Sequence, residues 1–331
     1  MDGQGREAIS EFNESMAGQD APPFASPFEN PADFEPSVSP WTDATNTTLL
    51  PGIYGVYNGT PGAADDWVMS MNFRVCLTNN ASNAINIAAP EGYTAAKLEL
   101  VRREIAAATA KGFKLTLSTM FLCRALPHQK LDLNSGAWDV RNSSGGYFPF
   151  STDLPWLQHD WPLGDPATRQ RVFDEHKWWT VALLYYLGND PELRKIQPGL
   201  VASVAEWGLC GDEYADTGHW TPQLYVRESV RLRGAAVITQ ADICDTTQPT
   251  VASSVGLSKW GVDIHDVKRV AWKINDTWVG RLTSPRPAQP KAAACCGLPT
   301  LSPPRPCSFV SCHRPNLTHA PGSSAATLNS G

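Results

Sequence analysis

A change of composition near residue 279 limits how much of this 331-residue chain can enter a folded core. Residues 281–331 contain nine prolines and five basic residues but no acidic residue, and no apolar period is sustained there. Such a segment cannot bury enough apolar surface to offset its conformational entropy. We therefore expect a disordered, proline-rich tail over residues 280–331 and a fold that lies before it.

Two further segments can be separated ahead of the tail. Pro, Asn, Asp, Ser and Thr recur between residues 22 and 61 without a helical or strand period, so residues 1–66 are expected to form an extended, loop-rich segment. Residues 67–279 carry periodic patterns. Alternating apolar residues predict strands over 67–78, with Arg74 on the less apolar face, and over 113–118.

Helical patterns lie in the same region as these strands. They occupy residues 94–112, 165–187, a short stretch from 190, and 199–209. The mixture predicts an α+β fold. His176 lies on the apolar stripe of the longest helix, where a hydrogen-bonded core histidine is commoner than a ligand.

Charge and hydropathy exclude several classes of partner. The formal net charge of -6 leaves no excess of positive charge for nucleic acid or anionic lipid. No run of about 18 apolar residues occurs, and the first ten residues lack the basic and apolar parts of a signal peptide. We expect a soluble protein with a small-molecule substrate and no nucleic-acid or membrane partner, and we leave its compartment and oligomeric state open.

Cysteines and glycosylation sequons bear on the compartment. Cys76, Cys123, Cys210 and Cys244 stand singly in apolar or mixed contexts, which favours buried free thiols over disulfides. The cysteines of the tail lack the paired spacing of a zinc site, so no metal site is expected. Sequons of the form Asn-x-Ser/Thr, a hint of secretion, occur at Asn13, Asn46, Asn58, Asn80, Asn142, Asn275 and Asn316.

The common catalytic motifs give little support to other enzyme classes. Gly3, Gly5 and Ala8 match the dinucleotide pattern G-x-G-x-x-A, but no strand precedes Gly3, so we do not expect these residues to hold a dinucleotide. A P-loop, an H-E-x-x-H and a G-x-S-x-G are all missing from the sequence, which argues against phosphoryl transfer, zinc proteolysis and serine hydrolysis.

The densest group of chemical side chains lies within residues 206–228. Its acids, histidine, tyrosine and arginine could converge on a ligand, or they could form a solvated, salt-bridged loop. Asp212 and Glu213 could also act as the acid/base pair of a glycan-active lyase or hydrolase, with tryptophans as sugar platforms. Adjacent residues of a strand point to opposite faces, which weakens that pairing.

Five ordered runs resemble one family. They are NFRVCLT at 72–78, EGY at 91–93, FSTDLP at 150–155, WGLCGDEYADTGHWTPQLYVRESVRLRG at 207–234 and SSVGLSKWGVDIHDVKRV at 253–270. In order and spacing they resemble FAD-dependent oxidoreductases, bacterial members of which are sometimes labelled xanthan lyase. The resemblance implies a Rossmann-type FAD-dependent oxidoreductase whose substrate domain corresponds to residues 67–279.

The same resemblance implies a cofactor and three site residues. In the family, the segments that bind FAD correspond to positions before Met1 and after Val279. This chain therefore resembles an internal fragment, with no cofactor-binding residues of its own and no activity in isolation. Tyr225 and Arg227 lie where the family's substrate domain faces the flavin, and His265 corresponds to the histidine of a D-S-H run.

The implied reaction is hydride transfer from an unidentified substrate, with carbohydrates among the candidates. The resemblance assigns Arg227 to orient an oxyanion or hydroxyl and His265 to accept a proton. Two alternatives remain at this point: the glycan-active enzyme that uses Asp212 and Glu213, and a noncatalytic remnant domain.

Overall fold

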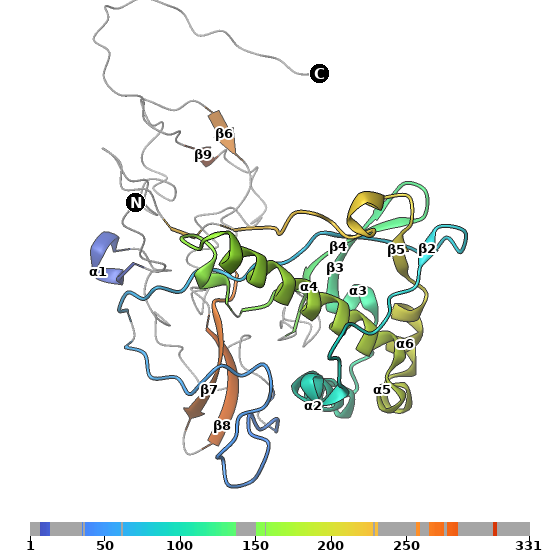
Figure 1. The fold of residues 1–331 in the computed structure, drawn as a ribbon. Coiled ribbons are helices and arrows are strands. Elements are labelled where there is room, and N and C mark those ends of the chain that lie inside the picture. The colour runs from blue at the N-terminus through green and yellow to red at the C-terminus, as the bar shows by residue number, and fades with distance from the viewer. Residues whose placement is uncertain are drawn as a thin grey trace, which may run out of the picture.

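The fold was described from a computed structural model, which covers residues 7–13, 35, 37–60, 62–136, 150–155, 157–227, 229–230, 256–258, 265–274, 277–283 and 307–309 (Figure 1). The strands are β1 Val75–Thr78, β2 Ala84–Ile85, β3 Phe121–Leu126, β4 Lys130–Gly136, β5 Gly208–Cys210, β6 Gly256–Ser258, β7 Lys268–Ile274, β8 Thr277–Thr283 and β9 Cys307–Phe309. The helices are α1 Ile9–Phe12, α2 Glu99–Ala110, α3 Leu117–Met120, α4 Pro166–Asn189, α5 Pro191–Ile196 and α6 Pro198–Ala205, with 3-10 turns η1 Ala95–Leu98, η2 Gln158–Asp160 and η3 Ala215–Thr217.

A five-stranded sheet in the order β2-β5-β1-β4-β3 forms the centre, and all its pairings are antiparallel. Its two faces differ in polarity because side chains alternate along each strand. Val75, Leu77 and Leu133 are buried on the core face. Arg74 and Asp132 form an ion pair on the other face. This agrees with the prediction that Arg74 lies on the less apolar face. The sheet and the helices together confirm an α+β fold.

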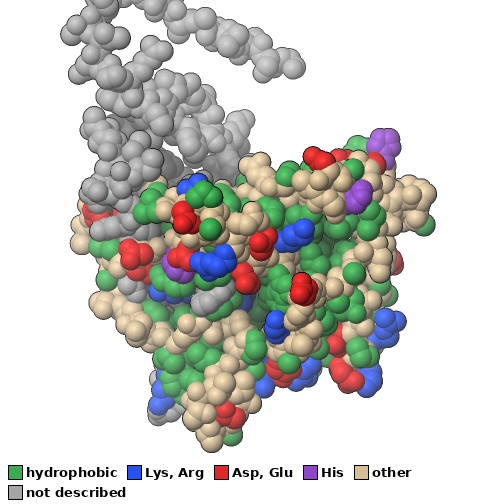
Figure 2. Space-filling model, in the orientation of Figure 1, with side chains coloured by type: hydrophobic (Ala, Val, Ile, Leu, Met, Phe, Trp, Pro, Cys, Tyr) green, Lys and Arg blue, Asp and Glu red, His purple; other side chains and the backbone are tan. Residues whose placement is uncertain are grey.

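The long helix α4 begins where the sequence predicts and ends at Asn189, two residues beyond the predicted end. The carboxylate of Asp165 accepts a hydrogen bond from the Thr168 amide at 2.7 Å, and Pro166 occupies the first turn. Helices α2, α5 and α6 gather near the C-terminal end of α4 (Figure 1). The face of the molecule that α4 crosses carries a hollow lined by apolar side chains, with acidic and basic side chains at its rim (Figure 2).

The strand predicted over residues 113–118 is wrong, because residues 117–120 form helix α3. Thr116 and Thr119 make a reciprocal capping box at the start of α3. The Leu117 amide donates to Ser203 Oγ at 2.9 Å rather than to a neighbouring strand. Local capping and side-chain acceptors from the neighbouring helices therefore override the apolar alternation.

Residues on the two sides of each predicted domain boundary share packing or strand pairing. Val38, Leu50 and Ile53 of the loop-rich segment are buried in the common core, and the Tyr54 amide donates to the Arg269 carbonyl of β7 at 2.9 Å. The boundary placed at residue 279 falls inside β8, which pairs with β7 as far as Thr283. Within the predicted tail, β9 pairs with β6. The rest of the tail lies outside the described residues.

A disulfide joins Cys76 to Cys210, so the prediction of free thiols is wrong for this pair. Leu77 lies opposite Leu209 in the β1–β5 register, which brings the preceding and following cysteines opposite each other, with their Cα atoms 5.7 Å apart. Cys123 is free, and burial raises the pKa of its thiol to about 11. The side chains of Cys244 and of the tail cysteines lie outside the described residues.

Removal of the disulfide in a Cys76→Ala/Cys210→Ala variant should cost about 2–5 kcal/mol of unfolding free energy, because the bridge closes a long loop in the unfolded chain. The sequence separation of 134 residues favours the upper part of this range. The measurement is urea denaturation, with Cys123→Ala as the control. Equal stability of the double variant and the unreduced parent protein would contradict the expectation.

No described helix combines the length and the apolar character needed to cross a membrane. Among the described residues, no group of three or more histidine, cysteine or acidic side chains is arranged to hold a metal ion.

Candidate functional site

Four extended segments that are far apart in the sequence meet beside the N-terminal end of β1. Met71 pairs with Leu154, and Asn72 pairs with Tyr225, in isolated antiparallel bridges. The Ser70 amide donates to the Asp266 carbonyl at 2.8 Å. Extended backbone flanking a sheet edge positions side chains firmly, because its amides and carbonyls are paired. Residues near 70, 153, 226 and 265 are therefore held side by side.

A buried carboxylate, Asp153, joins two of the predicted site residues. His265 Nδ1 lies 2.8 Å from one Asp153 oxygen, and the Arg227 guanidinium donates to the other at 3.2 Å. The exposed fractions of these side chains are 3% for Asp153, 4% for Arg227 and 9% for His265. We refer to Asp153, Arg227 and His265 as the Asp153 cluster.

The electrostatics of the Asp153 cluster favour the ionised carboxylate. Burial by itself raises the pKa of Asp153, because it disfavours the charged form. The charges of His265 and Arg227, and their hydrogen bonds to the carboxylate, outweigh burial and hold the pKa of Asp153 below its ordinary value. Asp153 is thus a buried anion that the Arg227 guanidinium and the His265 ring stabilise.

Arg227 is fixed by several acceptors at once. Besides Asp153, it donates to the Ser70 carbonyl at 3.1 Å and to Asn72 Oδ1 at 3.1 Å. Asn72 in turn donates to Asn134 Oδ1 of β4 at 2.9 Å. These contacts connect the Asp153 cluster to the central sheet and fix the orientation of the guanidinium.

Tyr225, the third predicted residue, makes no hydrogen bond to Asp153 in the structure. Its exposed fraction is 44%. The Arg227 guanidinium carbon lies 5.0 Å from the centre of the Tyr225 ring, within cation–π range. Tyr225 therefore stands at the solvent-facing side of the cluster, where a ligand can reach its ring and hydroxyl.

The sequence alone does not identify Asp153, although it lies in the FSTDLP run. The partners of its carboxylate lie 74 and 112 residues away, so no local pattern reveals them. The only sequence signal was an acidic residue inside a run that resembles the family. Asp263 and Ile264, which precede His265 in the DIH run, lie outside the described residues.

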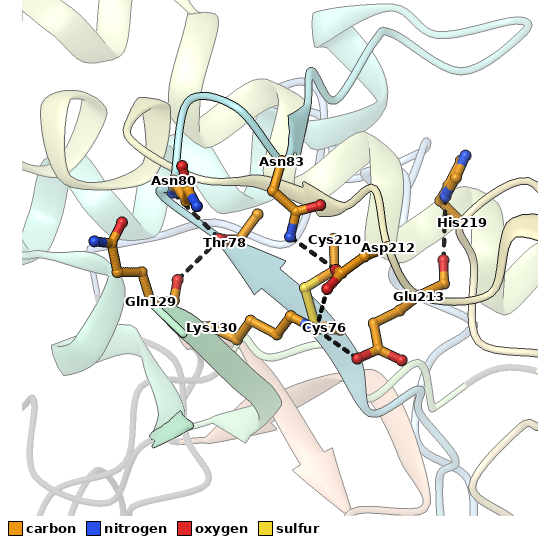
Figure 3. The surroundings of a disulfide bond; sticks show 10 residues. All are labelled: Cys76, Thr78, Asn80, Asn83, Gln129, Lys130, Cys210, Asp212, Glu213 and His219. Carbon is orange, nitrogen blue, oxygen red and sulfur yellow. Dashed lines mark hydrogen bonds and ion pairs between the residues drawn. A yellow bond between two sulfur atoms is a disulfide. The ribbon is translucent and has the colours of Figure 1, made fainter. Parts of the chain in front are cut away.

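A second cluster of charges surrounds the disulfide (Figure 3). Lys130 Nζ of β4 lies 2.8 Å from Asp212 and 2.5 Å from Glu213, so one ammonium group binds both carboxylates. Asn83 donates to Asp212 at 2.7 Å. The Glu213 carbonyl lies 3.1 Å from His219 Nδ1.

This arrangement is that of a salt-bridged loop rather than of a glycan-cleaving acid/base pair. The hydrogen bonds from Lys130 and then from Asn83 lower the pKa of Asp212, whereas a general acid needs a raised pKa. The side chains of Asp212 and Glu213 are 54% and 43% exposed. The surroundings of Asp212 thus favour its ionised form.

An Asp212→Asn/Glu213→Gln variant is therefore expected to oxidise substrate at the same rate as the parent protein, since among the described residues both carboxylates contact Lys130 and that of Asp212 also contacts Asn83. Dye-coupled oxidation assays on both proteins check this outcome. Loss of activity in the variant, with its fold unchanged by circular dichroism, would instead place these carboxylates in the chemistry.

His176 is a core residue, as the sequence predicts. It is fully buried, and its Nδ1 lies 2.7 Å from the Val172 carbonyl one helical turn earlier. Burial lowers the pKa of His176 to about 4, so the ring is neutral at physiological pH. His176 therefore serves the packing of α4 and is not part of the Asp153 cluster.

Comparison with known proteins supports the resemblance seen in the sequence. The family model described as FAD dependent oxidoreductase matches residues 4–284. Searches of curated proteins and of solved structures found no match to the chain. The matched range includes all five runs of the resemblance and all members of the Asp153 cluster. The chain belongs to the FAD-dependent oxidoreductase family.

Proposed function

We propose that this chain supplies the substrate-facing part of an FAD-dependent oxidoreductase and that the Asp153 cluster is its proton-transfer site. The observation that supports this proposal most is the buried contact of 2.8 Å between His265 Nδ1 and Asp153. An aspartate that holds one ring nitrogen of a histidine is a recurrent arrangement for a catalytic base. The proposed substrate is a small molecule that bears a hydroxyl group.

Oxidation of an alcohol to a carbonyl removes a hydride from carbon and a proton from oxygen. A bound flavin would accept the hydride, and the side chains of the Asp153 cluster would accept the proton. An ionised Asp153 can only accept hydrogen bonds, so the hydrogen between the two groups belongs to His265 Nδ1. Nε2 is then the nitrogen of His265 that exchanges a proton with the substrate hydroxyl.

Arg227 and Tyr225 have different proposed roles from each other. Arg227 directs its donors to Ser70, Asn72 and Asp153, so we propose that Arg227 positions the carboxylate. Exposed Tyr225 then provides the direct contact with the ligand. An oxyanion or hydroxyl beside the Tyr225 ring would still experience the positive field of Arg227.

The described residues do not fit the nucleotide half of FAD. Binding of a pyrophosphate in a Rossmann unit needs a strand, a glycine-rich turn and the N-terminus of a helix in succession. The strands of the central sheet pair only in antiparallel fashion, and none of the described strands leads through such a turn. Gly3 and Gly5 lie outside the described residues. We propose that other residues hold the FAD nucleotide.

Dye-coupled oxidation assays with FAD in excess test this function. A panel of sugars, sugar acids, aliphatic alcohols and hydroxy acids is offered to the protein, and reduction of the dye is followed with and without FAD. FAD-dependent oxidation of a hydroxyl-bearing class would support the proposed function, and it would show that the chain is active by itself, against the expectation from the resemblance. Cleavage of glycans without FAD would favour the lyase or hydrolase alternative, and binding without turnover would favour a noncatalytic domain.

A further inference from the structure

We propose that Asn46 is a site of N-linked glycosylation and that the protein matures in an oxidising, glycosylating compartment. Asn46 is followed by Thr47 and Thr48, which completes an Asn-x-Thr sequon. A sequon alone does not identify a modified residue. Two structural observations at Asn46 and one elsewhere in the chain support the proposal.

The first observation is the loop that carries Asn46. Residues 41–49 form a projecting loop closed by a bridge between Trp41 and Leu49 and by a bond of 2.8 Å from the Thr42 amide to the Thr48 carbonyl. Trp41 at its base is buried, with an exposed fraction of 7%. The loop, drawn in blue, extends beyond the β7–β8 hairpin in Figure 1. Its base is therefore anchored while its tip faces solvent.

The second observation is the geometry of the tip. Asn46 is exposed and adopts a φ of 56°, which asparagine tolerates better than most residues. Asp43 shapes the turn by accepting from the Thr45 amide at 2.9 Å. The side-chain amide of Asn46 makes no hydrogen bond to any described residue. A glycan on its Nδ2 would extend into solvent without displacing a contact.

Asn13 and Asn58 are exposed like Asn46, whereas Asn80 shows a contrasting environment. It is half-buried, and its Oδ1 accepts from the Ser82 amide at 3.1 Å and from the Ser82 hydroxyl at 2.9 Å. Its neighbourhood includes the disulfide and the Lys130 ion pairs (Figure 3). A bulky glycan there would compete with these contacts, whereas the tip of the 41–49 loop has room for one.

The third observation is the disulfide between Cys76 and Cys210, which is independent of the sequon. Structural disulfides form and persist in oxidising compartments and are rare in the cytosol. In eukaryotic cells, the compartment that forms disulfides also transfers glycans to asparagine. An exposed sequon and a long-range disulfide in the same chain therefore point to the same environment.

The transfer needs a sugar donor, a polyprenyl-diphosphate-linked oligosaccharide. Asn46 Nδ2 forms a bond to C1 of the reducing-end sugar while the bond from C1 to the diphosphate oxygen breaks. The polyprenyl diphosphate leaves with the electron pair, and one amide proton passes to a base of the transferase. No oxidant or reductant is consumed.

The proposal is tested on protein isolated from the cells that produce it. Chymotryptic peptides are treated with peptide N-glycosidase in heavy-oxygen water, which converts a glycosylated asparagine to labelled aspartate. We expect label at Asn46 and, in the unreduced digest, Cys76 and Cys210 peptides linked to each other. An Asn46 peptide that is unmodified before enzyme treatment would overturn the proposal. A sample without enzyme controls for spontaneous deamidation.

Variants made in a eukaryotic secretory host give a second measurement. Thr48→Ala destroys the sequon and leaves Asn46 in place, whereas Thr48→Ser preserves the sequon. We expect Thr48→Ala and Asn46→Gln to lose the same single glycan from the intact mass, and Thr48→Ser to keep it. If the intact masses of the Thr48→Ala and Thr48→Ser proteins differ only by the mass difference between alanine and serine, the assignment of the site is overturned.

Discussion

A His265→Gln variant is expected to lose about 10²–10⁴-fold in kcat/KM for the oxidised substrate, the usual contribution of a positioned general base. Glutamine keeps hydrogen-bonding capacity near Asp153 but cannot exchange a proton. The loss should therefore appear in turnover, while the fold is preserved. Dye-coupled oxidation with FAD in excess measures the effect, and thermal unfolding checks the fold.

His159→Gln is the matched control for this variant. His159 also lies beside an aspartate, with its Nε2 3.3 Å from Asp160, but it is 28% exposed, and its described contacts are with Asp160 and the Trp67 ring rather than with the Asp153 cluster. We expect its turnover to match that of the parent protein. Equal losses in the His265 and His159 variants would indicate a general effect of removing a histidine and would contradict the assigned role.

An Asp153→Asn variant should lose about 3–5 kcal/mol of unfolding free energy at neutral pH, because it leaves the buried Arg227 charge without its carboxylate. Asparagine has almost the same shape as aspartate, so the loss of unfolding free energy reports the missing charge rather than a change of volume. Asp132→Asn is the matched control. It breaks an Asp–Arg pair whose side chains are 18% and 38% exposed, and we expect it to cost about 1 kcal/mol or less.

The pH dependence of the Asp153 variant has a definite sign. The pKa of Asp153 lies below its ordinary value in the folded protein. Its contribution to the unfolding free energy is therefore fully present above the pKa of an unfolded aspartate. The contribution is lost as the pH falls through the folded pKa. The stability difference between parent and variant should thus be largest at neutral pH and shrink in acid. A difference that grows in acid would contradict the ion-pair explanation.

Local signals predicted the parts of the fold that depend on neighbours in the sequence. Asp165 and Pro166 placed the start of α4 correctly, because capping acts within one turn. The alternation around Arg74 likewise gave the correct faces of β1. The same alternation failed at residues 113–118, where acceptors from Ser203 and Gln197 satisfied the backbone.

Long-range partners were not readable from the residues. The cysteines of the disulfide looked like core thiols because apolar neighbours flank them, although those neighbours point to the opposite face of the sheet. The family resemblance indicated Arg227 and His265, and Asp153, which joins them, required the structure. Only the packing of four distant segments brings these three residues together.

The measurement that tests the Asp153 cluster most directly is a double-mutant cycle on turnover. Residues that act as one catalytic unit give strongly non-additive losses. The Asp153→Asn, His265→Gln and combined variants are compared with the parent at a temperature where all four are folded. We predict that the combined variant is no slower than His265→Gln alone, because Asp153 acts through His265. Losses that multiply in the combined variant would contradict a shared proton-transfer role.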